Sequence, residues 1–143
     1  MRYALPQSYD DLGHVADLGV RVRGATPEEV LARLVLALAT VLTGGGAIAG
    51  EREERIAARG GPGRALAAVA LLREILFRFA TERIVPAECE PLRIDDGGAE
   101  ARVTFGRFDL ERQEGTDVKA VTQHAARFER EGEGWVAEVV LDV

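Results

Sequence analysis

Two aspartates lie beside apolar segments near opposite ends of the sequence. Asp17 stands between Ala16 and Leu18, at the entry to an alternating apolar segment, and Asp142 follows the apolar run Val139-Val140-Leu141. A carboxylate among strand residues is costly to bury unless it is hydrogen-bonded, paired with a charge or bound to a cation. A metal-binding role and a solvated position at a strand end are therefore both open, and the spacing alone favours the solvated position.

Other residues that could carry chemistry are few. The two histidines, His14 and His124, each lie beside a predicted strand, where a lone histidine is most often a hydrogen-bonded structural residue. The single cysteine, Cys89, excludes an internal disulfide and a cysteine-based zinc cluster within one chain. The sequence has no G-x-S-x-G, P-loop or dinucleotide-binding glycine pattern and no nucleophile–base pair. A small metal-dependent hydrolase is therefore disfavoured.

A strand and a helix follow Asp17 in the predicted structure. The alternation of Leu18, Val20 and Val22 with small or charged residues predicts a strand with one wet face. The segment Thr26-Pro27-Glu28-Glu29 then predicts a helix start, with Thr26 accepting a hydrogen bond from the Glu29 N–H and the Glu29 carboxylate reaching back to the Thr26 N–H. The helix is expected to end near residue 42, before a triple glycine. Residues 34–42 carry no charge, which indicates a central helix.

The remaining elements complete an α+β fold. A second helix is expected from Arg64 to about Thr81, after a glycine-rich loop at residues 60–63. The segment Glu51 to Arg59 fits either an exposed helix or a strand. Further strands are expected at residues 87–94, 99–105, 118–130 and 135–143. Two helices against a mostly antiparallel sheet give an α+β fold, and the length suits a single domain over residues 1–143.

The charge balance limits the partners that the chain suits. The formal net charge is −6, from 18 basic and 24 acidic residues. A protein that holds RNA by neutralising phosphates needs an excess of Lys and Arg, so strong direct nucleic-acid binding is not expected. An acidic balance fits a basic protein partner, a metal ion or solubility alone. The sequence shows neither a secretory signal nor an apolar run long enough to cross a bilayer, so a cytoplasmic location is expected.

Four segments, in order and at the right spacing, resemble the archease family. His14-Val15-Ala16-Asp17, leading into Leu18-Gly19-Val20, resembles the family's N-terminal His-Thr-Ala-Asp motif. The helix start at residues 26–30 resembles the next segment of the family. Lys119-Ala120-Val121-Thr122-Gln123-His124 resembles the Lys-Ala-x-Thr-Tyr-His signature. The segment Trp135 to Val143 resembles the terminal strand, which closes on an aspartate and an aliphatic residue.

The resemblance implies an accessory protein rather than an enzyme. Archeases promote multiple turnover of an RtcB-type RNA ligase, which joins RNA ends, including tRNA halves, through a guanylylated intermediate. The family's metal site corresponds to Asp17, Asp142 and Val143, where Val143 would supply a backbone or terminal carboxylate oxygen. Ligation by oxygen alone suits a hard divalent cation such as Ca²⁺, Mg²⁺ or Mn²⁺.

The resemblance also assigns residues to the partner-facing motifs. Lys119 is expected to present a cation to a phosphate or to an acidic group of the ligase, and His124 to order the site by hydrogen bonding. His14 belongs to the N-terminal motif beside the metal ligand Asp17.

The sequence departs from the family pattern close to these residues. Gly13 stands in place of an acid, Val15 in place of Thr, and Gln123 in place of Tyr. A lost acid weakens a cation site, and Asp10 or Asp11 is a candidate replacement. The alternative function is therefore a divergent archease-fold module that binds a different protein and does not activate a ligase.

Overall fold

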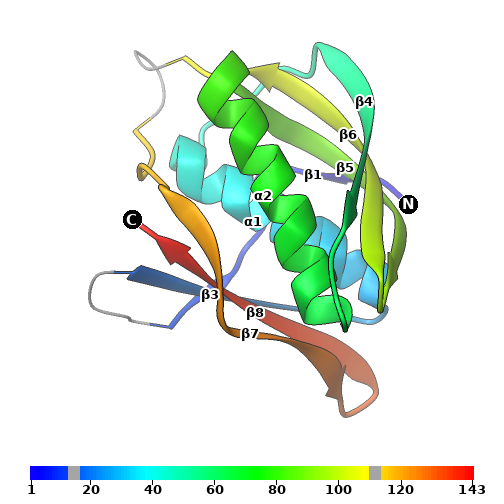
Figure 1. Cartoon of the computed structure of the whole chain (residues 1–143). Helices are drawn as coiled ribbons and strands as arrows, with labels where there is room; N and C mark the ends of the chain where they lie inside the picture. The colour runs from blue at the N-terminus through cyan, green and yellow to red at the C-terminus, as the bar shows by residue number, and fades with distance from the viewer. Residues whose placement is uncertain (13–16, 110–113) are drawn as a thin grey trace.

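The computed structural model describes residues 1–12, 17–109 and 114–143, and eight strands and two helices lie in these ranges (Figure 1). In chain order they are β1 Tyr3–Ala4, β2 Asp10–Asp11, β3 Asp17–Gly24, α1 Pro27–Thr43, β4 Arg52–Arg59, α2 Arg64–Glu82, β5 Ile84–Asp95, β6 Gly98–Arg107, β7 Ala120–Glu131 and β8 Gly134–Asp142. The expected strands and both expected helices are confirmed. The two-residue strands β1 and β2 are additions that no sequence pattern indicated.

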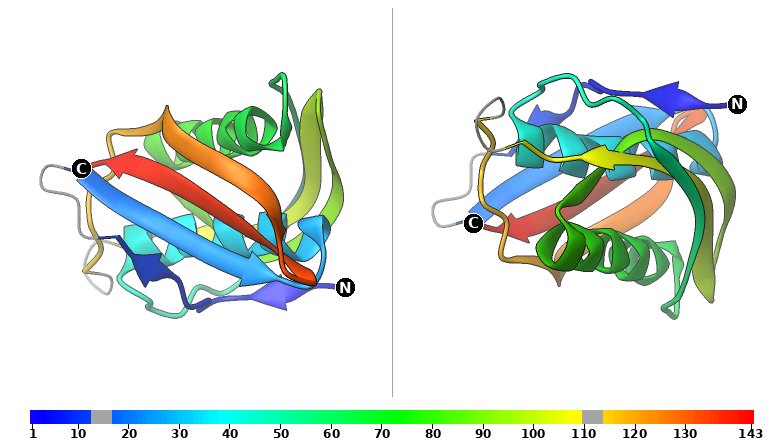
Figure 2. Two further views of the ribbon diagram at one scale, coloured as in Figure 1. Left: turned by 90° about the horizontal axis from the view of Figure 1, so that it is seen from below. Right: turned by 90° about the horizontal axis from the view of Figure 1, so that it is seen from above.

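The strands form two antiparallel sheets, and both helices lie between them (Figures 1 and 2). The first sheet has the order β1-β5-β6-β4 and the second the order β2-β3-β8-β7. Helix α1 packs against β5 of the first sheet and β3 of the second, while α2 packs against β4, β5 and β6 of the first sheet and β7 of the second. The α+β prediction is confirmed, and the structure adds that the strands divide between two sheets.

Helix α1 is the centre of the core. Except for Arg33 and Thr40, every residue from Val30 to Thr43 is buried, which agrees with the prediction of a central helix. Thr26 caps the helix by accepting a hydrogen bond from the Glu29 N–H at 3.1 Å. The predicted return bond differs, because the Glu29 carboxylate accepts from the Ala25 N–H rather than from the Thr26 N–H.

The glycines after α1 end the helix as expected. Gly44 has a φ of 70°, a left-handed conformation that glycine adopts without steric cost, and its N–H donates to the Thr40 carbonyl. The ambiguous segment that follows is the strand β4 rather than a helix. Its register against β6 places Ile56 opposite Ala101, and both residues are buried, which explains why a charged segment forms a strand here.

The second sheet has one buried and one outward face. Val20 and Val22 of β3 and Val139 and Leu141 of β8 are buried against the helices. Because side chains alternate along a strand, the residues between them point away from the core. Neither helix in the described part of the chain has the length and hydrophobicity that crossing a membrane requires.

Candidate functional site

Asp17 and Asp142 are opposite each other in the second sheet. Asp17 begins β3, Asp142 ends β8, and the two are register partners in the antiparallel pair. The preceding pair, Leu18 and Leu141, faces the core. Alternation therefore directs both aspartates to the outward face, and Asp142 is exposed. The fold brings together the two acids that the sequence singled out.

The chemistry of this acidic pair suits a hard cation. Directly opposite residues have Cβ atoms about 5 Å apart, and two like charges at that distance destabilise a sheet. Neither Asp17 nor Asp142 forms an ion pair within the described ranges, so their mutual repulsion is not offset by a described basic side chain. Two carboxylates supply part of an oxygen ligand set, and the adjacent Val143 can add a backbone oxygen. The residues present fit a divalent oxygen-liganded cation, although the described residues contain no group of three acidic, histidine or cysteine side chains placed for a metal.

Lys119 lies next to Asp142 along the neighbouring strand. Its backbone N–H donates to the Asp142 carbonyl at 2.7 Å, and Ala120 is the register partner of Asp142. Lys119 also lines a groove beside α2, and within the described residues its ammonium forms no ion pair. The structure therefore places Lys119 beside the acidic pair, with its charge available to a partner.

His124 lies further along β7, in an irregular segment. Thr122 pairs with Val140 and Arg127 pairs with Glu138, so four residues of β7, including His124, face the single residue Val139 of β8. The exposed His124 donates its backbone N–H to the Thr122 hydroxyl at 2.8 Å. His124 lies four residues along the chain from Ala120, the register partner of Asp142, and so is not next to the acidic pair.

Two expectations concern His14 of the N-terminal motif and Asp10 upstream of it. His14, with Gly13 and Val15, lies outside the described residues. Asp10, one of the two candidate replacements for the missing acid, has its carboxylate paired with Arg21 at 3.0 Å and with Arg23 at 3.2 Å.

An ion-pair ladder covers the outward face next to the acidic pair. Glu138 of β8 lies between its register partners Arg21 of β3 and Arg127 of β7, with N···O distances of 3.6 and 2.8 Å. Arg21 continues the ladder to Asp10, and Arg127 contacts Glu129. The hydrogen bond from Arg127 lowers the pKa of Glu138. This face is thus charge-balanced in its middle and anionic at its Asp17–Asp142 end.

The segment that precedes Lys119 crosses the C-terminal end of α1. The Thr116 N–H donates to the Val41 carbonyl at 2.9 Å, which satisfies one of the carbonyls that a helix end leaves without an intrahelical partner. Gly115 allows the approach, because a Cβ at this position would lie 1.8 Å from the Leu42 carbonyl oxygen. This contact anchors the chain before it enters β7 and so fixes where Lys119 lies.

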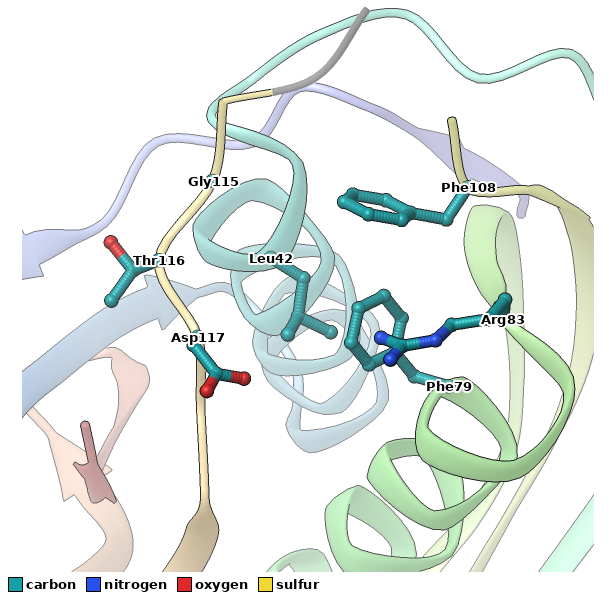
Figure 3. Close-up of a pocket in the computed structure, with 7 residues that line it drawn as sticks. All are labelled: Leu42, Phe79, Arg83, Phe108, Gly115, Thr116 and Asp117. Atoms are coloured by element: carbon teal, nitrogen blue, oxygen red, sulfur yellow. The ribbon is translucent and has the colours of Figure 1, made fainter. Parts of the chain in front are cut away.

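A pocket of about 270 Å³ lies between the same segment and the C-terminal ends of both helices (Figure 3). The Arg83 guanidinium lies 5.4 Å from the Phe79 ring centroid, and Phe108 packs edge-on against Phe79 at 5.1 Å. Figure 3 shows the Asp117 carboxylate and the Arg83 side chain pointing into the pocket from opposite sides. An apolar floor with opposite charges at the rim suits a small ligand that has both donors and acceptors. The pocket contains none of the site residues predicted from the sequence.

Sequence patterns did not indicate this pocket, and only a weak signal preceded it. Arg83 follows α2 in a left-handed conformation, with φ 55°, and its carbonyl accepts from the Phe108 N–H at 2.9 Å. These residues come from separate segments, so only the tertiary structure unites them. The one hint in the sequence is that Asp117, which lines the pocket, comes two residues before Lys119 of a family motif.

Comparison with known proteins decides the family. The model of the Archease protein family matches residues 9–143. The chain belongs to the archease family. All four motif segments lie within the matched range.

Curated archeases match along almost their whole length. The protein archease of Methanopyrus kandleri is 34% identical over 143 residues, which cover 94% of this chain and 99% of that protein. The protein archease of Methanosarcina barkeri is 29% identical over 142 residues, covering 96% and 97%.

Solved archease-fold structures agree with the fold described above. The solution structure of Methanobacterium thermoautotrophicum protein 1598 superposes with a TM-score of 0.75 at 26% identity, covering 94% of this chain and 98% of that one. A Thermotoga maritima crystal structure, described as an archease and possible chaperone, gives a TM-score of 0.60 at 24% identity, covering 96% and 99%. The second likeness concerns the fold alone.

Proposed function

We propose that this archease-family chain is a cytoplasmic, metal-binding accessory factor of an RtcB-type RNA ligase. It promotes guanylylation and multiple turnover of the ligase in tRNA splicing or RNA repair, and it is not itself an enzyme. The proposal rests on the family membership and on one observation in particular, the direct pairing of Asp17 with Asp142 at the outward end of the second sheet.

The acidic pair gives each nearby residue a role in this proposal. Asp17 and Asp142 hold a hard divalent cation, Ca²⁺, Mg²⁺ or Mn²⁺, with Val143 as a further oxygen donor. When bound, the cation offsets the repulsion between the carboxylates and offers a positive centre to phosphate or carboxylate oxygens. Lys119, held next to Asp142 by its backbone hydrogen bond, presents a second positive charge at the same end of the sheet.

Metal binding is tested on the protein alone. Thermal unfolding is measured with and without millimolar Ca²⁺, Mg²⁺ or Mn²⁺, because a ligand that binds only the folded state raises Tm. We expect a rise for the wild type and none for Asp17→Asn or Asp142→Asn. Asp96→Asn serves as the matched control, since Asp96 is an exposed aspartate in the β5–β6 turn. An equal rise for all variants would refute the proposed metal site.

Ligase activation is tested with the cognate RtcB-type ligase, GTP and an excess of RNA ends. The number of joined products per ligase molecule is expected to increase with the wild type and with Asp96→Asn. Asp17→Ala and Asp142→Ala are expected to lose most of that increase. Turnover that does not respond to the wild-type protein would contradict the accessory role.

The second candidate is a divergent archease-fold module that binds another protein without activating a ligase. The position of Gln123 and His124 on β7 favours it, because both lie beyond Ala120, the register partner of Asp142, and Gln123 departs from the family signature. This candidate predicts that the chain neither binds the ligase nor changes its turnover. Recovery of a stable complex from the two purified proteins counts against it.

A further inference from the structure

An apolar groove of about 480 Å³ separates the exposed side of α2 from the start of β7. It is lined by Arg73, Leu76, Phe77, Ala80, Lys119, Ala120 and Val121. Its floor is made by Leu76 and Val121, which are buried, and its wall by Phe77, which is 59% exposed. Phe77 and Met1 are the large apolar residues that the described part of the chain leaves in solvent. An exposed aromatic ring beside an apolar groove is a common feature of protein contact sites.

The rim of the groove is cationic in a protein that is acidic overall. Arg73 donates from Nε to the Val121 carbonyl at 2.8 Å, which fixes the side chain along the β7 edge. Neither Arg73 nor Lys119 forms an ion pair within the described ranges, and no described residue that lines the groove is acidic. Most arginines on the two sheets are instead paired with carboxylates, namely Arg21, Arg23, Arg52, Arg55, Arg93, Arg102 and Arg127. The groove therefore has two basic side chains without a described ion pair and no acidic lining residue, which makes it locally positive in a chain of net charge −6.

We propose that this groove docks a segment of the partner ligase that carries an apolar anchor residue flanked by acidic residues. The anchor packs against Phe77 and Leu76, and the acidic residues pair with Arg73 and Lys119. This inference rests on the proposed function and names the face through which it operates. Because Lys119 belongs both to the groove and to the end of the sheet where Asp142 lies, docking here brings the ligase next to the proposed metal site.

Two other occupants fit the groove less well. RNA would need more than two cations and gains little from an apolar floor, and the net charge of −6 opposes it. A second copy paired about a two-fold axis would bring the same cationic rim of both copies together, in a protein whose net charges already repel. An acidic, apolar protein segment satisfies both the floor and the rim.

The experiment measures the Kd between the full-length chain, labelled at its N-terminus, and the cognate ligase by fluorescence anisotropy. Phe77→Ser is expected to weaken binding by about tenfold or more, as expected for loss of an aromatic anchor. Phe77→Leu keeps the apolar contact and is expected to stay within about threefold of the wild type. Leu92→Ser is the matched control, because Leu92 is a partly exposed leucine on β5 of the other sheet. Affinity is expected to fall as salt rises, because the rim is charged.

The outcomes separate this inference from the proposed function. Equal binding by Phe77→Ser and the wild type overturns the docking site, and turnover stimulation by both proteins then leaves the accessory role intact. Phe77-dependent binding without stimulation supports the docking site and overturns the accessory role. Three results would each overturn the ligase as the occupant of the groove. They are no binding by the wild type, a dimer that Phe77→Ser dissociates in sedimentation, and RNA binding that Phe77→Ser weakens. Unchanged Tm for Phe77→Ser shows that the variant is folded.

Discussion

Gly115 lies so close to the end of α1 that no side chain fits between them. The nearest atom to a methyl group added at Gly115 would be the Leu42 carbonyl oxygen, followed by the Leu42 carbonyl carbon and the Thr43 nitrogen. These are backbone atoms of a buried helix and have little room to move. A residue with any side chain would therefore push the segment that leads to Lys119 away from α1.

Gly115→Ala is expected to destabilise the protein. Because the clash is with backbone, we expect a loss of about 2 kcal/mol in the free energy of unfolding, within the range for overpacked sites. Gly97→Ala is the control, since its added Cβ would meet only the Asp95 carboxylate, at 3.7 Å, and is expected to change stability by less than about 1 kcal/mol. Urea denaturation measures both. Equal stability of the two variants would show that the segment does not depend on this contact.

Individual residues were predictable where the chemistry is local. The Thr26 cap follows from four adjacent residues and is present, whereas the Glu29 carboxylate accepts from the Ala25 N–H instead of the Thr26 N–H. The pairing of Asp17 with Asp142 could not come from spacing, since it depends on the register of two strands from opposite ends of the chain. Only the resemblance to archeases linked the two acids in advance.

The outward ladder of the second sheet ties three strands together through side chains. Glu138 sits on the central strand β8 and receives Arg21 from one neighbour and Arg127 from the other. Arg127 also marks where regular pairing of β7 resumes after its bulge. The ion pair therefore helps to set the register on the far side of that bulge.

A double-mutant cycle tests this element. Arg127→Met, Glu138→Gln and the double variant are compared by urea denaturation at neutral pH. The pair is partly exposed and screened by water, so a coupling energy of about 0.5–1 kcal/mol is expected. The coupling is expected to vanish as the pH falls through the lowered pKa of Glu138, because the protonated carboxyl no longer pairs with Arg127. A coupling that persists in acid would point to packing rather than charge.

Elements differed in how far the sequence determined them. Helix α1 was predictable because its cap, its uncharged run and its glycine stop agree. Strand β4 was ambiguous because Ile56 is its one fully buried side chain, and the partner strand β6 decides its conformation. The β7 bulge left no sequence signal, since Gln123 and His124 read as ordinary strand residues. His124 lies apart from the acidic pair because it comes four residues after Ala120, the register partner of Asp142.

Carboxylates throughout the molecule are stabilised in their charged form by arginines. Hydrogen bonds from Arg93, Arg55, Arg23 and Arg127 lower the pKa values of Asp95, Glu100, Glu131 and Glu138, respectively. A carboxyl whose pKa is lower when folded than when unfolded binds fewer protons in the folded state. It therefore stabilises the fold above the pKa of the unfolded chain, and that contribution is lost as the pH falls through the folded pKa.

The prediction for the whole molecule is acid sensitivity. Tm is expected to be nearly constant from pH 7 to about pH 5 and to fall steadily below the ordinary carboxyl pKa of 4.5. Thermal melts followed by circular dichroism, at constant ionic strength, measure this. Raising the salt concentration at pH 7 should lower Tm in the same direction but less, because salt screens exposed pairs. A Tm that increases on acidification would contradict the assignment of these ion pairs.

The class of the fold was predictable, and its arrangement was not. Alternating strands and two apolar helices are enough for an α+β prediction. They do not reveal that β4, β5 and β6 form one sheet with β1 while β7 and β8 join β2 and β3 in another. Strands of both sheets show the same alternation of apolar and polar residues, so this pattern does not tell which sheet a strand joins. That choice depends on which side of each helix the strand covers.

The two sheets are interleaved along the chain, with all of the central strands of the first falling between β3 and β7 of the second. The β7–β8 hairpin consequently binds intramolecularly to the rest of the chain, through β3 and α2, which together act as its receptor. Its affinity for that receptor is part of the stability of the whole fold, and the covalent tether sets its effective concentration. Because Asp142 belongs to this hairpin and Lys119 directly precedes it, release of the hairpin also takes the proposed site apart.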